Sequence, residues 1–448
     1  MRPMSETRGL LSEHSRNVQS RPIDRAARVF DRDSRRHRSR RVLRVCGSAG
    51  KARLVVAMLA ISALFLSTIF ILPFSLSPEM PDRTVPATPL GIVGDVAWTD
   101  MSPSISPDVR AASAFVYDPP TDTYVLFGGM DIESSNFFGD TWSYDLGANS
   151  WQELSPADHP ELTVFPAYAY DSADEVMLLF CTVDSMFNLL NETWSYDASA
   201  NDWTNLLATN APSFRAYSSA VYDSQSEKLV MFGGITDLMG VSKCVNETWS
   251  FDFTSNAWTE LTPALSPSPR YLSSMAYDSE SDRIIVFGGY FEDSEGNGIA
   301  LADTWSYHFG SNTWTNMTPS LSPPERMGAS CFYDPISDSV LVWGGAQPMG
   351  ALDDLWAYDY GTNSWSEVNQ LTRPLGRAYG SMAIDPTTGV AVLFGGASMS
   401  GTLGDTWVVQ PGTPIPEFQT VILPAVGVIV MVIALAGLMK RARRQRRD

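Results

Sequence analysis

An arginine recurs along the middle of this 448-residue chain, each time seven residues before an aromatic residue or isoleucine. The five positions are Arg110, Arg215, Arg270, Arg326 and Arg377, followed by Tyr117, Tyr222, Tyr277, Tyr333 and Ile384. A guanidinium group presents paired donors that match carboxylate, sulfate and phosphate groups. These five arginines are therefore the candidate ligand-binding residues, and an anionic group would be their ligand.

The same arginines have potential partners inside the chain. An acidic residue precedes a Thr-Trp or Leu-Trp pair farther along each unit, at Asp140, Glu192, Glu247, Asp303, Asp354 and Asp405. If the arginine and the acid lie two strand spacings apart, about 10 Å separates their backbones, and the two side chains together can span that distance. The sequence leaves both interpretations open: a ligand-binding cluster, or an ion pair within each unit.

No other combination of residues indicates catalysis. His14 and His37 lie in a basic N-terminal segment, whereas His159 and His308 are expected on opposite faces of the fold. The acidic stretch at Asp293 begins like a calcium loop, but Thr304 stands where the loop needs glutamate. We therefore expect no catalytic residue, no metal and no cofactor. Paired carboxylates for glycoside hydrolysis remain the enzymatic alternative among the many acids.

These residues belong to a unit that is repeated six times. Its phrase Phe-Gly-Gly, or a variant, places an aromatic residue at 127, 180, 232, 287, 343 and 394, which gives spacings of 51 to 56 residues. A Thr-Trp or Leu-Trp pair and, in five units, a second tryptophan follow. Each unit predicts four short strands, which is typical of one blade of a β-propeller. Cys181 and Thr182 replace the glycines in the second unit.

The pattern resembles the kelch repeat over about residues 96–410. The resemblance implies an all-β, six-bladed kelch-type propeller, of the class that includes the central domain of galactose oxidase, and an oxidising enzyme of that kind is a further alternative. Kelch propellers that capture acidic peptides use arginines from a similar part of the blade. The sixth unit lacks its last strand, and the segment Ala97–Met101 is expected to supply it and close the ring.

The loops of this fold divide between two faces. Short, similar turns follow the first and third strands, and long, dissimilar loops follow the second and fourth. Because variable loops on a rigid scaffold usually carry binding, the second face is the predicted recognition surface.

Charge is distributed unevenly. Residues 1–54 hold 15 Lys/Arg against 5 Asp/Glu, and residues 440–448 hold 6 against 1, although the whole chain carries a net charge of -19. The part between is strongly acidic and would repel a phosphate backbone, so we expect no nucleic-acid partner.

Both ends of the chain carry membrane signals. Residues 54–76 and 418–439 are uncharged stretches of 23 and 22 residues, each long enough to span a bilayer. The predicted order is a basic cytosolic tail (1–53), a signal-anchor helix (54–76), a linker (77–95), the propeller (96–410), a linker (411–417), a second transmembrane helix (418–439) and a basic tail (440–448). Basic flanks stay in the cytoplasm, so the propeller would be extracellular. Cleavage after Ser75 is the alternative to a retained N-terminal anchor.

Smaller signals support a location at the cell surface. Sequons at Asn191, Asn246 and Asn316 are candidate glycosylation sites. Cys181 and Cys244 either form a disulfide or remain free thiols. The phrase Ile415–Phe418, with the helix and basic cluster after it, resembles archaeal PEF-type sorting signals, which implies a sorting transpeptidase as a partner. We thus expect a membrane-anchored, non-catalytic binding or adhesion module for a protein or glycan ligand, with a carbohydrate-active or galactose-oxidase-like enzyme as the alternative.

Overall fold

A computed structural model describes residues 95–410 of the chain, except residue 164 and residues 184–188, 237–242 and 294–296. The predicted tails (1–53 and 440–448), membrane spans (54–76 and 418–439), sorting signal (415–418) and linkers (77–94 and 411–417) lie outside the described residues. Among the residues that are described, no helix is long and apolar enough to cross a membrane.

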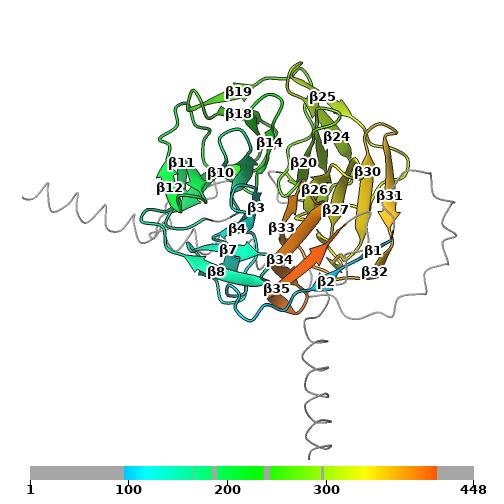
Figure 1. Ribbon diagram of the computed structural model, residues 1–448. Coiled ribbons are helices and arrows are strands. Elements are labelled where there is room, and N and C mark those ends of the chain that lie inside the picture. The colour runs from blue at the N-terminus through cyan, green and yellow to red at the C-terminus, as the bar shows by residue number, and fades with distance from the viewer. Residues whose placement is uncertain (1–94, 164, 184–188, 237–242, 294–296, 411–448) are drawn as a thin grey trace, which may run out of the picture. The chain divides into compact units, whose positions relative to one another are not determined.

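Six four-stranded antiparallel sheets stand around a common axis, so the predicted all-β propeller with six blades is confirmed (Figure 1). Blade one contains β3 (Ala114–Asp118), β4 (Thr123–Phe127), β7 (Thr141–Asp145) and β8 (Ser150–Leu154). Blade two contains β9 (Ala167–Asp171), β10 (Val176–Val183), β11 (Leu189–Asp197) and β12 (Asp202–Asn205). Blade three contains β14 (Ser219–Asp223), β15 (Lys228–Phe232), β18 (Thr248–Asp252) and β19 (Ala257–Leu261).

The remaining blades repeat this order. Blade four contains β20 (Ser274–Asp278), β21 (Arg283–Phe287), β24 (Thr304–His308) and β25 (Thr313–Asn316). Blade five contains β26 (Ser330–Asp334), β27 (Ser339–Trp343), β30 (Leu355–Asp359) and β31 (Ser364–Val368). Blade six contains β33 (Ser381–Asp385), β34 (Val390–Ser398), β35 (Gly401–Val409) and β2 (Thr99–Asp100).

The sixth blade takes its outer strand from the beginning of the described region. In β2, Thr99 pairs with Val408 and Asp100 pairs with Trp407 of β35. This is the predicted ring closure, and it pairs the outer edge of β35 with a fourth strand. A further short strand, β1 (Val96–Ala97), runs parallel to β32 (Gln370–Thr372) and ties the same segment to blade five.

The blades adhere through one repeated aromatic contact. The outer-strand tryptophan of each blade packs on the second-strand aromatic residue of the preceding blade. Ring centroids lie 4.6 to 5.1 Å apart in the six pairs Trp151–Phe394, Trp203–Phe127, Trp258–Phe180, Trp314–Phe232, Trp365–Phe287 and Trp98–Trp343. Each of these tryptophans is almost completely buried, so these contacts are a repeated part of the core between sheets.

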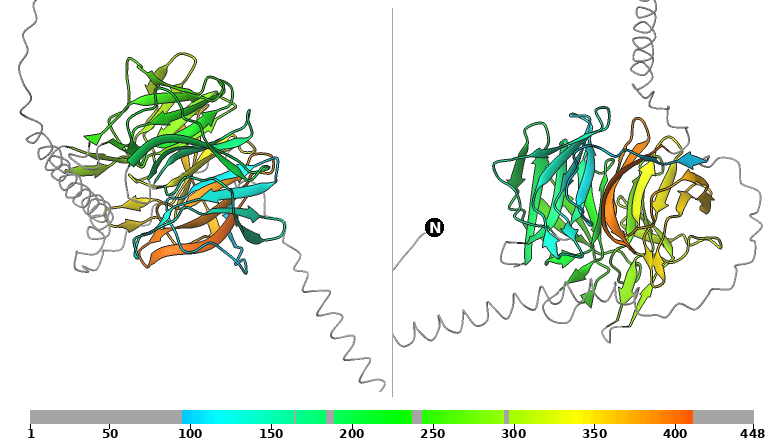
Figure 2. Two further views of the ribbon diagram at one scale, coloured as in Figure 1. Left: turned by 90° about the vertical axis from the view of Figure 1, so that its left-hand side faces the viewer. Right: turned by 90° about the horizontal axis from the view of Figure 1, so that it is seen from below.

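Short hairpins extend beyond the blades on one side of the ring. They are β5 (Met130–Asp131) with β6 (Asn136–Phe137), β16 (Ile235–Thr236) with β17 (Lys243–Cys244), β22 (Tyr290–Glu292) with β23 (Gly298–Ala300), and β28 (Ala346–Gln347) with β29 (Gly350–Ala351). A two-residue strand, β13 (Arg215–Ala216), joins the sheet of β16 and β17. The right-hand view of Figure 2 shows the ring from its edge, with yellow-green and yellow hairpins projecting from one face.

Candidate functional site

The five recurring arginines are buried and bound to acids of their own blades. All have 0–1% of their surface exposed. Arg270 donates from both terminal nitrogens to Asp303, at 2.6 and 2.8 Å, and also donates to the carbonyl oxygen of Gly288 at 3.0 Å. Arg110 and Arg326 repeat this arrangement with Asp140 and Asp354. Arg377 does so with Asp405, and Arg215 bonds Glu247 through one nitrogen at 2.7 Å.

These contacts overturn the prediction that Arg110, Arg215, Arg270, Arg326 and Arg377 form a ligand-binding cluster. An incoming anion would have to displace a carboxylate, which is bidentate at all of these arginines except Arg215, from a guanidinium that solvent does not reach. The alternative of pairing within blades is the one that the structure shows. The arginines position the blades and do not present free charge at the channel mouth.

The acids in these pairs are held in their charged form. Burial raises the pKa of Asp303, but hydrogen bonds and the positive charge of Arg270 outweigh that effect, and the net pKa lies below its ordinary value. The same balance lowers the pKa of Asp140, Asp354 and Asp405.

Blade two lacks the arginine and replaces it with hydroxyl groups. Thr163 occupies the arginine position and donates to the carbonyl oxygen of Cys181 at 3.3 Å, as four of the five arginines do to the equivalent glycine. Thr182, which replaces the second glycine, donates to Glu192 at 2.8 Å. Although this unit departs furthest from the repeat in sequence, its four strands pair like the others.

On the face of the ring that carries the short hairpins, the central channel is bounded by a ring of residues that we call the collar. The collar contains the second residue after each arginine position, namely Ala112, Phe165, Tyr217, Leu272, Gly328 and Tyr379. All six have φ between 48° and 61°. Five backbone amides donate to the carbonyl of the collar residue in the preceding blade, at 2.8 to 3.2 Å. Left-handed backbone at non-glycine residues costs energy, and this belt of hydrogen bonds holds it in place.

Aromatic side chains of the collar meet across the axis. The ring centroids of Phe165 and Tyr217 lie 4.2 Å apart, and those of Phe165 and Tyr379 lie 5.3 Å apart. Phe165 belongs to blade two and Tyr379 to blade six, which are not neighbours, so their contact crosses the channel. Gly328 makes room, because a Cβ atom there would lie 2.4 Å from the Tyr379 ring. These side chains narrow the channel on the face of the ring that carries the short hairpins.

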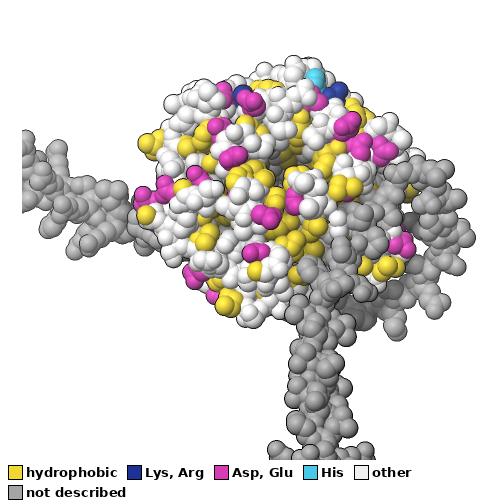
Figure 3. Space-filling view, viewed as in Figure 1, with side chains coloured by type: hydrophobic (Ala, Val, Ile, Leu, Met, Phe, Trp, Pro, Cys, Tyr) yellow, Lys and Arg dark blue, Asp and Glu magenta, His cyan; other side chains and the backbone are white. Residues whose placement is uncertain are grey.

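Beyond the collar the channel widens into a cavity of about 500 Å³, which we call the cup. Its lining extends along the first strands to the turns that follow them, including Pro119, Ser172 and Ser224. The cup therefore opens on the face of short turns, opposite the face predicted from the sequence. Figure 3 shows a central hollow with hydrophobic side chains inside and acidic side chains around it.

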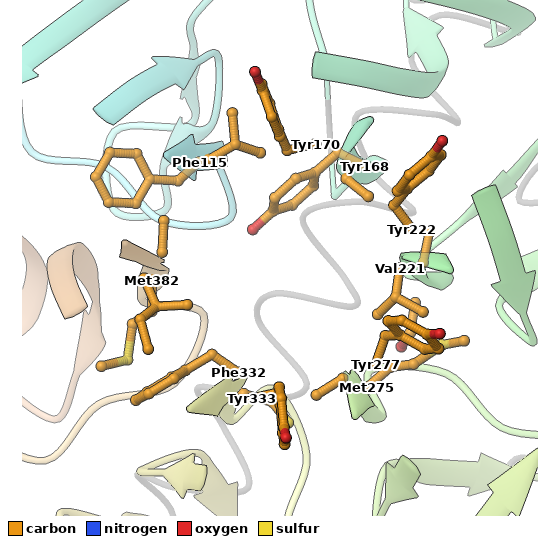
Figure 4. A pocket seen from close by; sticks show the side chains of 18 of the residues that line it. Phe115, Tyr168, Tyr170, Val221, Tyr222, Met275, Tyr277, Phe332, Tyr333 and Met382 are labelled. Carbon is orange, nitrogen blue, oxygen red and sulfur yellow. The ribbon is translucent and has the colours of Figure 1, made fainter. Parts of the chain in front are cut away.

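The wall of the cup is aromatic and aliphatic. Figure 4 shows Tyr168 reaching toward the middle of the cup, with Phe115, Met275, Phe332 and Met382 around it. Burial raises the pKa of Tyr168 to about 12, so its hydroxyl is neutral at physiological pH. None of the residues that line the cup is lysine, arginine or histidine.

Tyrosines surround the cup mouth, and buried aspartates stand behind them. The tyrosines are Tyr117, Tyr170, Tyr222, Tyr277 and Tyr333, and the aspartates, which end the six first strands, are Asp118, Asp171, Asp223, Asp278, Asp334 and Asp385. The aspartates are at most 7% exposed and accept bonds from the following turn, as Asp278 does from Glu280 and Ser281. Burial is the first cause that raises the pKa of each tyrosine. The aspartate of the preceding blade is the second cause for Tyr170, Tyr222 and Tyr277, whereas for Tyr117 and Tyr333 it comes after a hydrogen bond to an aspartate of their own turn.

The other predicted sites are dispersed. His308 bonds Asp282 at 3.0 Å, and His159 bonds the carbonyl of Pro160. In the described part of the chain, no group of three or more His, Cys, Asp or Glu residues could hold a metal ion. Cys181 and Cys244 are both free and buried. Burial raises the pKa of the Cys181 thiol to about 12, although Arg215 opposes the shift.

The three sequon asparagines differ in their surroundings. Asn191 and Asn246 donate from the side-chain amide to the carbonyls of Pro212 and Pro267, at 3.2 and 3.1 Å. Asn316 is exposed at the end of β25, and its side-chain oxygen accepts from the amide of Thr318. The amide nitrogen that a glycan would modify is therefore already bonded at two of the three sites.

Sequence reasoning missed the cup, although the signal was present. A tyrosine recurs as the last residue but one of the first strand in five units, always directly before aspartate. That pattern gives a ring of aromatic residues backed by carboxylates once the ring closes. The collar had no comparable signal, because its six positions share a backbone conformation and not a residue type.

Comparison with known proteins shows what the repeats are similar to. The family model described as Attractin/LZTR1 beta-propeller matches residues 94–296, and that described as KLHDC2/KLHL20/DRC7 Kelch-repeats domain matches residues 262–415. Kelch domain-containing protein 10 of Xenopus tropicalis is 24% identical over 316 residues, which cover 66% of this chain and 73% of that protein. The described ring is thus a β-propeller whose sequence is similar to kelch-repeat domains. The likeness to galactose oxidase and to PEF-type signals stays a prediction.

Two other relatives share only a small part of their length with this chain. Multiple epidermal growth factor-like domains protein 8 of Mus musculus is 24% identical over 284 residues, 58% of this chain and 10% of its own length. The flagellar outer arm dynein alpha chain of Chlamydomonas reinhardtii is 27% identical over 197 residues, 41% of this chain and 4% of its own.

Proposed function

We propose that this protein is a membrane-anchored, extracellular and non-catalytic binding module whose loop face recognises a protein or glycan partner. The loop face is the side of the ring that carries the hairpins after the second strands and the connections after the fourth. The observation that carries the proposal is the set of short hairpins that project from one face of the closed ring. The printed name of the kelch relative also supports a repeat domain of this kind.

Hydrogen bonds hold some of the hairpins in place. The amide of Ile132 beside β5 donates to Thr402 of blade six at 3.1 Å, and within blade four the Tyr271 hydroxyl donates to Glu292 of β22 at 3.2 Å. A braced surface loses little conformational entropy when a partner binds, which favours affinity.

The loop face exposes apolar side chains at the ends of its hairpins. Ile299 is 59% exposed, Met349 81% and Met399 43%, and the three stand on the adjacent blades four, five and six. Since isolated exposed apolar residues are common, their placement on three neighbouring hairpins is what supports a contact surface.

The acidic surface of the domain favours some classes of binding partner over others. Arginine and lysine are scarce in the described residues, and the five arginines of the blade pairs are buried, so the accessible surface is acidic. An acidic surface favours a partner with a basic rim and makes association faster at low salt. Glycans at Asn191, Asn246 and Asn316, and processing by a sorting transpeptidase near Ile415–Phe418, belong to the same proposal.

The proposal is tested by partner capture with variants of the hairpin tips. Cell-surface proteins and a glycan array would be screened with the full-length chain and with a triple variant carrying Ile299→Asp, Met349→Asp and Met399→Asp. The control is Ile336→Asp, at an equally exposed residue (51%) in a first-strand turn of the opposite face. We expect a saturable ligand that the triple variant loses by at least about tenfold and the control retains. A ligand bound equally by both variants would place recognition elsewhere.

A further inference from the structure

The cup has features that the proposed loop-face function does not use. It is a cavity of about 500 Å³, within the size range of small-molecule sites of about 300–1,000 Å³. The collar narrows its inner end, and its mouth lies on the face of short turns. A ligand would therefore enter and leave from one side, and the site is separate from the loop face.

The polarity of the cup excludes most ligand classes. An anion would find no positive partner, because no lysine, arginine or histidine lines the cavity. The surrounding carboxylates Asp118, Asp171, Asp223, Asp278, Asp334 and Asp385 are unopposed by any cation among their hydrogen-bond partners in the described residues. Their field at the mouth is negative and is weakly screened, because these carboxylates are buried.

The faces of aromatic rings inside the cup also favour a positively charged ligand. The Tyr168 ring extends toward the middle of the cavity, and tyrosines such as Tyr170 and Tyr333 stand around it (Figure 4). The rings of Phe115 and Phe332 point away from the cavity into the cores between blades, where they are 1% and 5% exposed. The face of an aromatic ring carries negative electrostatic potential and attracts an organic cation. Met275 and Met382 also line the cavity, but their side chains point into the cores between blades and are 7% and 8% exposed.

We propose that the cup binds a free small-molecule organic ammonium cation, with the alkyl groups against the aromatic wall and the positive charge near the ring of aspartates. A metal ion fits poorly, because the aspartate oxygens already accept bonds within their turns and the wall offers aromatic and aliphatic groups. A neutral apolar molecule would use the wall but gain nothing from the carboxylates. The cation is the ligand class that uses both.

Calorimetry on the purified full-length chain tests the proposal. Choline would be the probe, and 3,3-dimethylbutanol, which has the same shape without the charge, would be its control. We expect saturable binding of choline, at least about tenfold weaker binding of the neutral analogue, and weaker choline binding as salt is raised. Equal affinity for both molecules, or no binding of choline, would overturn the proposal.

Variants at the mouth locate the site. Ser172 and Ser224 line the cup and are exposed, so Ser172→Lys combined with Ser224→Lys adds positive charge without disturbing the core. The matched control is Ala200→Lys with Thr254→Lys, at exposed third-strand turns of the same two blades that do not line the cup. The cup variant should weaken choline binding about tenfold or more and the control should not. Equal weakening in both would show only a general charge effect and overturn the assignment.

Tyr168 supplies an independent readout. Tyr168→Leu removes the aromatic face and should weaken choline about tenfold, while the affinity for the neutral analogue changes little. An equal loss for both ligands would mean that Tyr168 only shapes the cavity and that no cation-specific contact exists. Binding at the loop face uses other residues, so the hairpin-tip variants should leave choline binding unchanged, and either proposal can fail alone.

Discussion

The arginine at the start of a blade connects two blades through two different groups. Its guanidinium binds the acid of its own blade, as Arg270 does with Asp303. Its carbonyl oxygen accepts the amide of the second glycine in the preceding blade, as Arg270 does from Gly234 at 2.8 Å. The first glycine of that pair has φ of +73°, and a Cβ atom there would lie 2.4 Å from the same carbonyl oxygen. Arginine and Gly-Gly thus form one joint between blades.

The pKa shift of Asp303 gives this joint a pH dependence. Its folded pKa lies below the ordinary value of about 4, so the unfolded chain binds more protons in acid. The stabilisation is fully present above about pH 4 and is lost as the pH falls through the lowered folded pKa. We expect Asp303→Asn to cost about 1–3 kcal/mol at pH 6 and almost nothing once Asp303 of the parent is also protonated. Thermal melts of both proteins between pH 6 and pH 2.5 measure this convergence.

Blade two provides the control for that experiment. Glu192 occupies the position of Asp303, but its side chain bonds the hydroxyl of Thr182 and the indole of Trp194, with no arginine. Glu192→Gln should therefore cost less than Asp303→Asn at pH 6. Equal losses would mean that the ion pair contributes no more than neutral hydrogen bonds.

At the scale of the element, one glutamine replaces a contact that the other blades make with threonine. In five of the six blade pairs, the outer tryptophan donates its indole N–H to the threonine that directly precedes the tryptophan of a third strand, at 2.9 to 3.1 Å. Blade five begins its third strand with Leu355, which offers no acceptor. Gln370 instead accepts from Trp98 at 2.8 Å and from Trp343 at 3.2 Å.

Removing this acceptor should destabilise the joint between blades five and six. Gln370→Leu leaves two buried indole donors unsatisfied, at about 1–3 kcal/mol each. The control, Gln152→Leu at an exposed site, should change stability by less than about 0.5 kcal/mol. Adding Leu355→Thr to Gln370→Leu restores the acceptor used in the other blades, so the double variant should lose less than the sum of the single losses. Strict additivity in chemical denaturation would contradict this account.

The repeated sequence predicts those features of the fold that depend on identical residues in each unit. It does not predict features that depend on a residue unique to one unit or on a backbone conformation that unlike residues share. The glycine pairs and tryptophans gave the strands and the number of blades, and the orphan Trp98 indicated how the ring closes. The pairing of arginines with acids could only be proposed as an alternative, because spacing does not show which side chains solvent reaches. The role of Gln370 stands outside the repeat, and the collar has six unlike residues with one conformation. Neither could be found from residue types alone.

At the scale of the whole molecule, closure rests on a short segment far from its partner strand in sequence. Two residues of β2 pair with β35, while Trp98 packs on Trp343 of blade five with 3% of its surface exposed. The segment also carries β1, which pairs with β32. One stretch of about six residues therefore joins blades five and six, and the cup and the loop face both depend on the ring that it closes.

A chain that begins at Ser102 should be less stable because the joint between blades five and six is weakened, whereas a chain that begins at Asp95 should keep its stability. The shorter chain loses the burial of Trp98, worth about 3–5 kcal/mol, and leaves the outer edge of β35 unpaired. Its melting temperature should fall by roughly 10 °C or more, because 1 kcal/mol corresponds to about 2–4 °C in a domain of somewhat smaller size. A synthetic peptide of residues 95–101 added in trans should restore the loss, and the same peptide with Trp98→Ala should not. Unchanged melting of the shorter chain would mean that the five complete blades hold the sixth in place without its outer strand.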